Sequence, residues 1–213
     1  MAEYTAMIIE PRRHPALQFV LKNALENLSD EWGIIVFHGL KNIKFVKDIL
    51  KTLKQYSNRI SLVKLHVSNL TKPKYSKLLV SRDFYKHIPT EIFLIFQTDS
   101  IIFCTNKHKI NQFLHYDYVG APWKDGVGNG GLSLRRKSKM LSIIDSFPYN
   151  KEPEDLFFAC RDPTVYKPSI EKAKEFSVEH LYHPASFGSH QAWIFHPKLM
   201  ATYPELKILM DLQ

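Results

Sequence analysis

The segment FLIFQTDSIIF (residues 93–103) decides the predicted fold, because it is an apolar run interrupted by one acidic residue, Asp99. Its β-branched and aromatic residues are typical of a strand buried on both faces of a parallel sheet. A carboxylate at the end of such a strand is costly to remove from water unless a partner compensates it. A divalent cation is one such partner, since hard cations prefer carboxylate oxygens. The alternative is that Asp99 caps a turn or a helix start.

Strand and helix patterns alternate along residues 4–96. Strands are expected at 4–9, 33–37, 60–67 and 92–96, and helices at 16–28, 42–56 and 75–87. This alternation predicts an α/β fold with a mainly parallel central sheet flanked by helices. Because such sheets bind ligands at the carboxyl ends of their strands, we expect Glu10, Arg12, His38 and Asp99 along one rim.

The sequence changes character after residue 110 and becomes rich in glycine, aromatic and turn residues. We expect a helix over 134–147, a short helix over 152–158, irregular chain over 177–190 and a terminal helix over 205–212. The segment GVGNGG (126–131) matches neither a Walker A loop nor a dinucleotide fingerprint. It is either a tight turn between strands or a backbone wall that approaches a ligand closely. Glu154 and Asp155 either stabilise the helix that they begin, through its dipole, or supply a general base.

Composition limits the classes of protein that fit. The 213 residues suit one domain, and the net charge of +8 suggests an anionic partner. The basic residues are scattered and no nucleic-acid motif is present, so a small phosphate-bearing ligand fits better than a specific nucleic acid. Cys104 and Cys160 lie in apolar sequence and are predicted to be buried free thiols, as in a reducing compartment. Without a signal peptide or an apolar run that spans a membrane, we expect a soluble cytoplasmic protein.

Four segments, in order, resemble glycosyltransferases of the GT-A type. They are QTDS (97–100), YDYVGAPW (116–123), GNGGLSLR (128–135) and EDLFF (154–158). A later segment, FGSHQAW (187–193), is similar to one in a poorly characterised group of GT-A-like domains, some of them encoded by large DNA viruses. The resemblance covers nearly the whole chain. It implies one GT-A-like (Rossmann-like) domain over 1–213, with a nucleotide-binding half at 1–110 and a sugar and acceptor half at 111–213.

The resemblance also implies an activity: transfer of a sugar from a nucleotide-sugar donor, a UDP-sugar, to a hydroxyl of a saccharide or protein-linked acceptor. The Asp-x-Asp motif of the family corresponds here to Gln97-Thr98-Asp99, so Gln97 replaces the first acidic residue and one carboxylate remains. Asp99 and His190 are the implied protein ligands of Mn²⁺ or Mg²⁺. The diphosphate and water molecules would complete the coordination. If the source is viral, the expected location is the host cytoplasm.

The remaining site residues are assigned by the same resemblance. Glu10, Arg12, Arg82, Gln97 and Thr98 occupy positions that contact the nucleotide. The wall that faces the transferred sugar and the acceptor corresponds to Asn129, Gly130 and Gly131, and the catalytic base to Glu154 or Asp155.

Two other functions are also consistent with the sequence. The missing carboxylate at Gln97 is consistent with a non-catalytic module of the same fold that binds sugars or nucleotides. The positive charge is consistent with a basic nucleic-acid-binding protein, whose affinity would collapse as salt rises.

Overall fold

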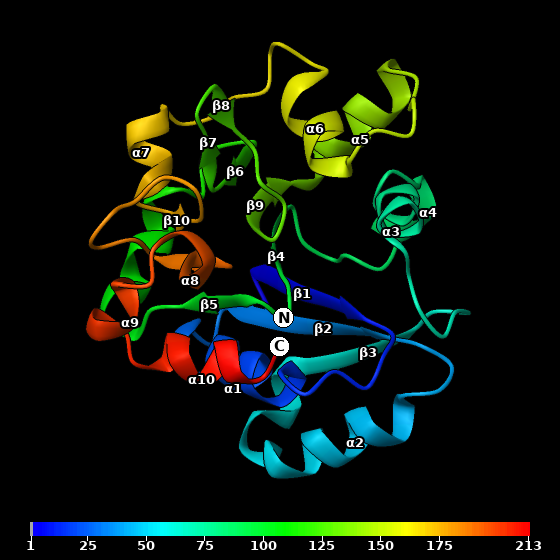
Figure 1. The fold of residues 1–213 in the computed structure, drawn as a ribbon. Coiled ribbons are helices and arrows are strands. Elements are labelled where there is room, and N and C mark those ends of the chain that lie inside the picture. Colours follow the sequence, from blue (N-terminus) through cyan, green and yellow to red (C-terminus); the bar gives the residue numbers. More distant parts are fainter. Residues whose placement is uncertain (1) are drawn as a thin grey trace.

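A computed structural model describes residues 2–213, and its centre is a six-stranded sheet (Figure 1). The strands are β1 (Tyr4–Glu10), β2 (Trp32–His38), β3 (Ile60–Lys64), β4 (Ile92–Phe96), β6 (Tyr118–Gly120) and β9 (Leu132–Arg136). Their order is β3-β2-β1-β4-β9-β6. The four strands from β3 to β4 are parallel, and β9 runs antiparallel to both of its neighbours. The mainly parallel α/β fold predicted from the sequence is therefore confirmed.

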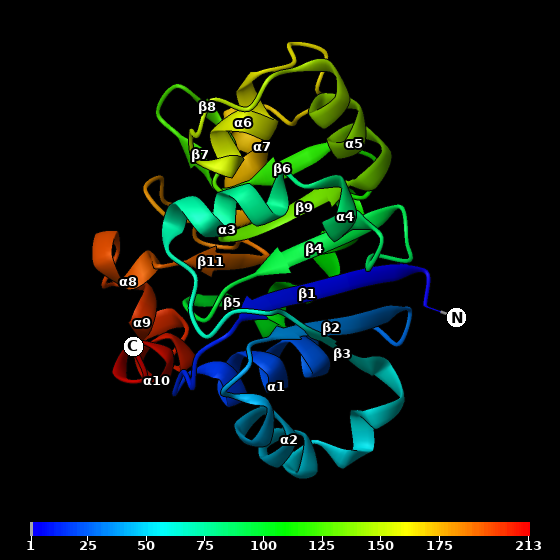
Figure 2. The ribbon, with the colours of Figure 1, turned by 90° about the vertical axis from the view of Figure 1, so that its right-hand side faces the viewer.

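Helices cover both faces of this sheet. Those on one face are α1 (Leu17–Asn27), α2 (Ile43–Thr52) and α10 (Glu205–Asp211), and those on the other are α3 (Lys72–Leu79), α4 (Arg82–Tyr85), α5 (Lys137–Ser146) and α6 (Glu154–Cys160). Successive side chains of a strand point to opposite faces. Thus Ala6 and Ile8 pack in the first of the two cores, whereas Met7 packs in the second. Figure 2 shows the strands stacked from β6 at the top to β3 at the bottom, with α3 in front.

Smaller elements join the two halves of the chain. A second sheet, in the order β10-β11-β5, contains β5 (Ser100–Ile102), β10 (Ser177–Val178) and β11 (Gly188–His190). The other elements are the hairpin of β7 (Pro122–Trp123) and β8 (Gly126–Val127), the 3₁₀ helices η1 (Lys54–Arg59) and η2 (Cys104–Gln112), and the short helices α7 (Ile170–Lys174), α8 (Ala192–Phe195) and α9 (Leu199–Thr202). Because β11 pairs with β5, the late histidine segment lies beside the turn that carries Asp99.

The structure corrects several predicted elements. The run at 93–103 forms two strands, β4 and β5, separated by a turn at 97–99. The helix predicted at 75–87 is two helices, α3 and α4. The helix predicted at 42–56 is shorter, because α2 ends at Thr52 and the 3₁₀ helix η1 follows it. Residues 177–190, predicted to be irregular, contain β10 and β11.

The helix predicted at 134–147 begins instead as strand β9, and helix α5 starts only at Lys137. The reason is period-two burial: Leu132 and Leu134 pack on one face of the sheet, whereas Arg135 is buried on the other beside Tyr118.

The two cysteines differ from the sequence prediction. Cys104 and Cys160 are exposed free cysteines, so the prediction that both thiols are buried was wrong. Among residues 2–213, no helix combines the length and the apolar character that crossing a membrane requires.

Candidate functional site

A cleft of about 480 Å³ lies at the carboxyl ends of β1 and β4. This is the edge at which parallel α/β sheets bind ligands. Residues from both halves of the chain line it: Ile9, Glu10, Pro11, Arg12, Asn69, Leu70, Lys72, Pro73, Tyr75, Ser76, Gln97, Thr98, Asp99, Asn129, Gly130, Gly131, Lys151, Glu152, Pro153, Glu154, Asp155 and His190. The predicted site and rim residues are all in this set except Arg82 and His38.

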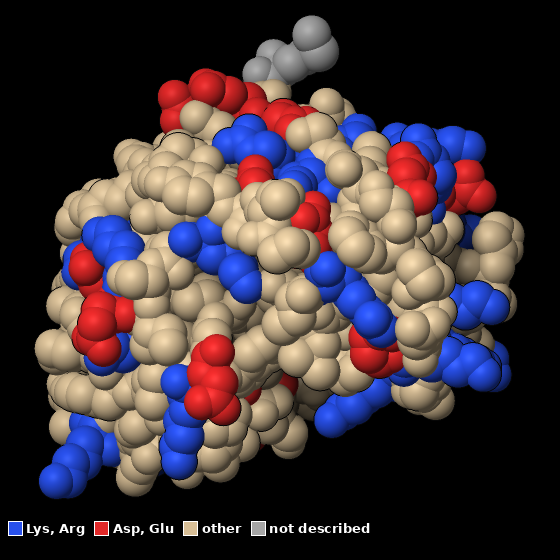
Figure 3. Space-filling view, turned by 90° about the horizontal axis from the view of Figure 1, so that it is seen from above, with Lys and Arg blue, Asp and Glu red and all other residues tan. Residues whose placement is uncertain are grey.

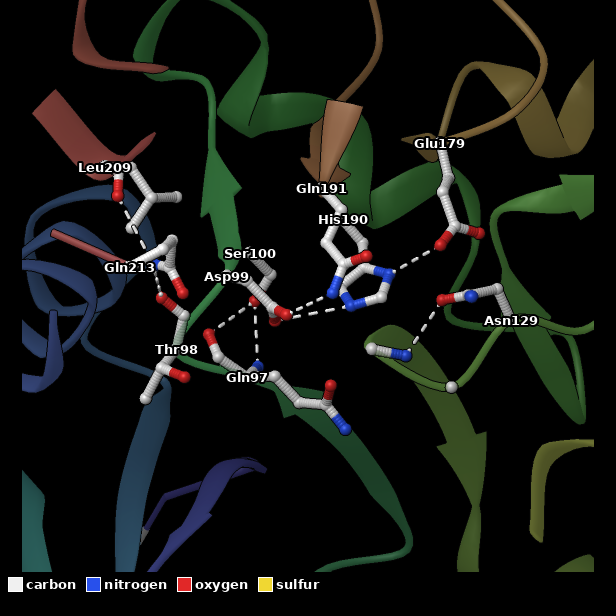
Figure 4. A network of polar contacts seen from close by, with 12 residues as sticks. Gln97, Thr98, Asp99, Ser100, Asn129, Glu179, His190, Gln191, Leu209 and Gln213 are labelled. Atoms are coloured by element: carbon white, nitrogen blue, oxygen red, sulfur yellow. Dashed lines mark hydrogen bonds and ion pairs between the residues drawn. The ribbon is translucent and has the colours of Figure 1, made fainter. Parts of the chain in front are cut away.

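Asp99 lies in the turn after β4, and Gln191, which follows β11, holds its carboxylate (Figure 4). Gln191 donates its backbone N–H to the carbonyl oxygen of Asp99 and its side-chain amide to Oδ2 of the same residue. To do so, Gln191 adopts a left-handed backbone conformation with φ of 49°, which is uncommon for a residue other than glycine. Burial opposes ionisation of Asp99, but the nearby imidazole of His190 and the hydrogen bond from Gln191 outweigh it and lower its pKa.

His190 lies between two carboxylates. Its Nδ1 is 3.0 Å from Oε1 of Glu179, and its Nε2 is 3.3 Å from Oδ1 of Asp99. Burial disfavours the charged imidazolium, yet the two carboxylates outweigh burial and raise the pKa of His190 to about 9. Without a bound metal, His190 is therefore positively charged at neutral pH.

The Asp99–His190 pair fits a divalent cation. Asp99 Oδ1 and His190 Nε2 are both buried, and neither has a hydrogen-bond partner among the described residues. The two atoms lie 3.3 Å apart and would hold one ion together, since Mn²⁺ accepts carboxylate oxygen and imidazole nitrogen as ligands. No group of three or more His, Cys, Asp or Glu side chains suited to a metal occurs within residues 2–213. The chain thus offers two ligands, and a bound diphosphate or water would have to supply the others.

The segment Asn129–Gly131 forms a backbone wall of the cleft rather than only a turn. A Cβ atom on Gly131 would overlap the imidazole ring of His190, and one on Gly130 would lie 2.6 Å from Oε1 of Glu154. The side chain of Asn129 accepts a hydrogen bond of 2.9 Å from the N–H of Gly131 and so fixes the turn. Two glycines let the chain pass between the histidine and the acidic residues.

Glu154 and Asp155 have different environments although they are adjacent. Glu154 is buried, and both of its oxygens accept hydrogen bonds from the guanidinium of Arg135, at 2.5 and 3.0 Å. Burial raises the pKa of Glu154, and Arg135 opposes that rise. Asp155 is partly exposed, and its carboxylate accepts only backbone hydrogen bonds, from Gly130 at 3.3 Å and from Leu156 at 2.9 Å.

The other predicted residues divide into two groups. Glu10, Arg12, Gln97 and Thr98 line the cleft, and the guanidinium of Arg12 forms a two-point pair with the carboxylate of Glu10. Arg82 lies outside the lining set on α4 and pairs with Asp145 of α5.

His38, expected at the rim, is also outside the lining set. It is buried, and its Nδ1 lies 2.9 Å from the carbonyl oxygen of Gly39.

The structure adds site residues that the sequence did not indicate. Lys72 and Lys151 bring two further cations to the cleft, and Glu179 and Gln191 hold His190 and Asp99. Lys151 has a positive φ of 67°, which no sequence pattern marks. Glu179 carries a weak signal, since it follows a short apolar stretch and precedes His180.

Comparison with known proteins gives a family and a fold. Residues 59–190 match a family described as "Protein of unknown function (DUF5672)". No curated protein matches the sequence.

Among solved structures, a mannosyltransferase from Pyrobaculum calidifontis, in complex with GDP-mannose and Mn²⁺, is 13% identical with a TM-score of 0.54. Residues 1–349 of TarS from S. aureus are 12% identical with a TM-score of 0.55, and the glycosyltransferase GlyE from Streptococcus pneumoniae is 9% identical with a TM-score of 0.54. The matches cover 72%, 97% and 89% of this chain, respectively. The chain spans 49%, 65% and 54% of these three structures, about half to two thirds of their length. At these identities the likeness shows a shared glycosyltransferase fold.

Proposed function

The protein belongs to the DUF5672 family, whose function is unknown, and we propose that it is a glycosyltransferase that uses a nucleotide-sugar donor. The observation that carries the proposal is the pair of buried atoms Asp99 Oδ1 and His190 Nε2, which lie 3.3 Å apart and have no hydrogen-bond partner among the described residues. They line one cleft together with the glycine wall and Asp155, on the fold of known glycosyltransferases. The acceptor would be a hydroxyl of a saccharide or of a protein-linked group.

The donor is proposed to be a UDP-sugar bound with Mn²⁺ or Mg²⁺. Asp99 and His190 would hold the metal, which when bound neutralises charge on the leaving diphosphate. Lys72 and Lys151, which have no ion-pair partner among the described residues, would add positive charge near the phosphates. Residues 1–110 would bind the nucleotide and residues 111–213 the sugar and the acceptor.

Asp155 is proposed as the base that removes the proton of the acceptor hydroxyl. Glu154 is less suited, because Arg135 occupies both of its oxygens in a buried pair. The carboxylate of Asp155 is partly exposed in the cleft and keeps acceptor capacity beyond its two backbone hydrogen bonds. A viral source and a cytoplasmic location remain predictions from the sequence.

The test is a binding panel of UDP, GDP and other nucleoside diphosphates, each with Mn²⁺, Mg²⁺ or a chelator, followed by calorimetry and thermal shift. We expect UDP to bind with Mn²⁺, and Asp99→Ala to lose the metal-dependent part of that binding. Asp83→Ala, which removes an exposed carboxylate on α4, is the matched control and should bind normally. If no nucleoside diphosphate binds the wild-type protein, the proposal is wrong.

A non-catalytic binding module of the same fold is the second candidate. It is favoured by Gln97 at the first acidic position and by the lack of a third acidic, histidine or cysteine ligand in the described part of the chain. Release of nucleotide from a bound donor separates the two functions. A transferase turns the donor over, and Asp155→Asn lowers that rate by about 10²-fold or more while UDP binding persists. A module binds the donor without any turnover.

A basic nucleic-acid-binding role has weaker support. Figure 3 shows Lys and Arg interleaved with Asp and Glu on the face seen from above, rather than gathered in one stripe. Several exposed cations of the molecule are engaged in ion pairs, among them Lys22, Lys51 and Lys86.

A further inference from the structure

Glu179 is a buried carboxylate that neither the resemblance nor the family match assigns. It is 5% exposed, and its Oε1 lies 3.0 Å from Nδ1 of His190. Its second oxygen, Oε2, has no hydrogen-bond partner among the described residues, although Nδ1 of His180 is 3.2 Å away. Burying a carboxylate is costly unless hydrogen bonds or an opposite charge compensate it. The contact of Glu179 with His190 therefore requires a physical explanation.

The sheet register explains how Glu179 meets His190. Strand β10 pairs with β11 in parallel, with Ser177 opposite Gly188 and Val178 opposite Ser189. Glu179 follows β10 directly, so the next position in the same register is opposite His190. On its other side, β11 pairs with β5, which brings His190 opposite Ser100 and beside Asp99. The three-stranded sheet therefore aligns Glu179, His190 and Asp99 in one row (Figure 4).

In this row the two nitrogens of the His190 imidazole face different carboxylates. Nδ1 faces Glu179, whereas Nε2 faces Asp99 and the cleft and has no hydrogen-bond partner among the described residues. A carboxylate can only accept a hydrogen bond, so Glu179 favours the tautomer that carries the hydrogen on Nδ1. In the metal-free site the charged imidazolium carries hydrogen on both nitrogens. When a metal replaces the Nε2 hydrogen, Glu179 retains the hydrogen on Nδ1 and Nε2 supplies its lone pair.

We propose that Glu179 is a positioning residue that presents His190 Nε2 as a metal ligand, because its buried carboxylate accepts the Nδ1 hydrogen and fixes the ring. The inference rests on the proposed metal site of Asp99 and His190. A carboxylate behind a metal-binding histidine orients the ring and raises its basicity, and loss of such a partner typically costs 10- to 100-fold in metal affinity. Glu179 touches no substrate in this arrangement and acts only through His190.

The experiment measures binding of Mn²⁺ alone to the full chain, by the electron paramagnetic resonance signal of free Mn²⁺, with no nucleotide or sugar present. We expect Glu179→Ala to weaken Mn²⁺ binding about 10- to 100-fold. Glu179→Gln keeps an oxygen that accepts the Nδ1 hydrogen and should lose less than about tenfold. Glu171→Ala, which removes an exposed carboxylate of α7, is the matched control and should bind as the wild type does.

A double-mutant cycle separates positioning from a structural role. In the His190→Ala background, Glu179→Ala should change the weak remaining Mn²⁺ affinity by less than about twofold, because Glu179 acts through that ring. An equal loss in both backgrounds would overturn the proposal. So would wild-type affinity in Glu179→Ala, or a wild-type chain that does not bind Mn²⁺.

A second measurement does not depend on folding of a variant. Long-range proton–nitrogen correlation spectra of the Mg²⁺-saturated wild-type protein report which nitrogen of His190 carries hydrogen. Hydrogen on Nδ1 supports the proposal, and hydrogen on Nε2 overturns it. Because no nucleotide enters either experiment, failure of UDP to bind would reject the transferase without affecting this inference.

Discussion

Gly131 occupies a position at which any side chain would collide with His190. A Cβ atom there would overlap Cδ2 and Nε2 of the ring, whose other side is held by Glu179. The φ angle of Gly131 is not positive, so the need for glycine is one of space and not of backbone conformation. The position of the proposed metal ligand therefore depends on a residue that has no side chain.

We predict that Gly131→Ala displaces His190 and weakens Mn²⁺ binding by about tenfold or more, since metal affinity depends on ligand orientation. Overpacking should also lower the free energy of unfolding by about 1–3 kcal/mol. Metal titration and urea unfolding measure the two effects. Gly126→Ala is the control, because a Cβ atom there has no neighbour within 4 Å, and it should bind Mn²⁺ normally. Equal affinity in the two variants would contradict the packing explanation.

The contact between strand β9 and helix α6 depends on a buried ion pair. The guanidinium of Arg135 is 0% exposed and lies 4.8 Å from the ring centre of Tyr118 and 5.6 Å from that of Phe158. Its Nε donates to Ser133, and its other nitrogens donate to Glu154. The pair thus fixes the start of α6, where Asp155 enters the cleft.

We predict that Arg135→Met lowers the free energy of unfolding by about 3–5 kcal/mol, because it leaves the Glu154 carboxylate buried without its partner. The double variant Arg135→Met/Glu154→Leu removes both charges and should recover much of that loss. Urea unfolding measured on both variants gives the comparison. If the double variant is as unstable as the single one, the cost comes from lost packing rather than from an unpaired charge.

A second ion pair ties helix α5 to the loop after α6. Asp162 accepts hydrogen bonds from Lys139 at 2.8 Å and from the hydroxyl of Thr164 at 2.7 Å. These bonds lower the pKa of Asp162 to about 2, below its ordinary value of 3.8. A depressed carboxylate pKa means that the stabilisation is present above the unfolded-state value and is lost as the pH falls through the folded-state value.

We therefore predict that Asp162→Asn lowers the free energy of unfolding by about 1 kcal/mol at pH 7, the range of a partly exposed ion pair. The difference from the wild type should shrink as the pH falls from about 4 toward 2, since Asp162 then becomes neutral in both states. Urea midpoints at pH 7, 4 and 3 measure it. A difference that is constant over this range would exclude the carboxylate charge as its source.

At the scale of the whole molecule, the cleft is built from both halves of the chain. Glu10, Arg12 and Asp99 come from the first 110 residues, and Gly131 and Asp155 come from the rest. The strand pairs β4–β9 and β5–β11 hold the halves together. A ligand that fills the cleft should consequently stabilise the protein as one unit.

We predict that UDP with Mn²⁺ protects the amides of Glu10, Arg12 and 97–100 from hydrogen exchange, whereas a complete UDP-sugar also protects those of 129–131 and 154–156. The physical reason is that exchange follows local opening, which a ligand opposes only where it binds. Hydrogen exchange with mass spectrometry, at ligand concentrations about 100-fold above Kd, measures both patterns. Identical protection by UDP and by the sugar nucleotide would contradict the division into a nucleotide half and a sugar half.

The sequence by itself determined several elements and selected candidate site residues. Periodic apolar positions specify β1, β2, β4, α1 and α10 nearly to the residue, since local burial patterns follow the 2.0 and 3.6 periods of strands and helices. The sequence singles out Asp99, Asn129–Gly131, Asp155 and His190, because they belong to short segments that occur along the chain in the order typical of the GT-A type. All of them line the cleft.

Only the tertiary structure decided which partners these residues have. Both oxygens of Glu154, one of the two predicted bases, accept hydrogen bonds from Arg135, 19 residues away, and Arg82 pairs with Asp145, 63 residues away. The row of Glu179, His190 and Asp99 arises from the pairing of β10, β11 and β5. Hydrogen bonds and ion pairs act over a few ångströms in space, regardless of separation along the chain. The local pattern therefore specifies the type of several elements, whereas strands such as β9 and β10 and the partners of the site residues depend on the fold.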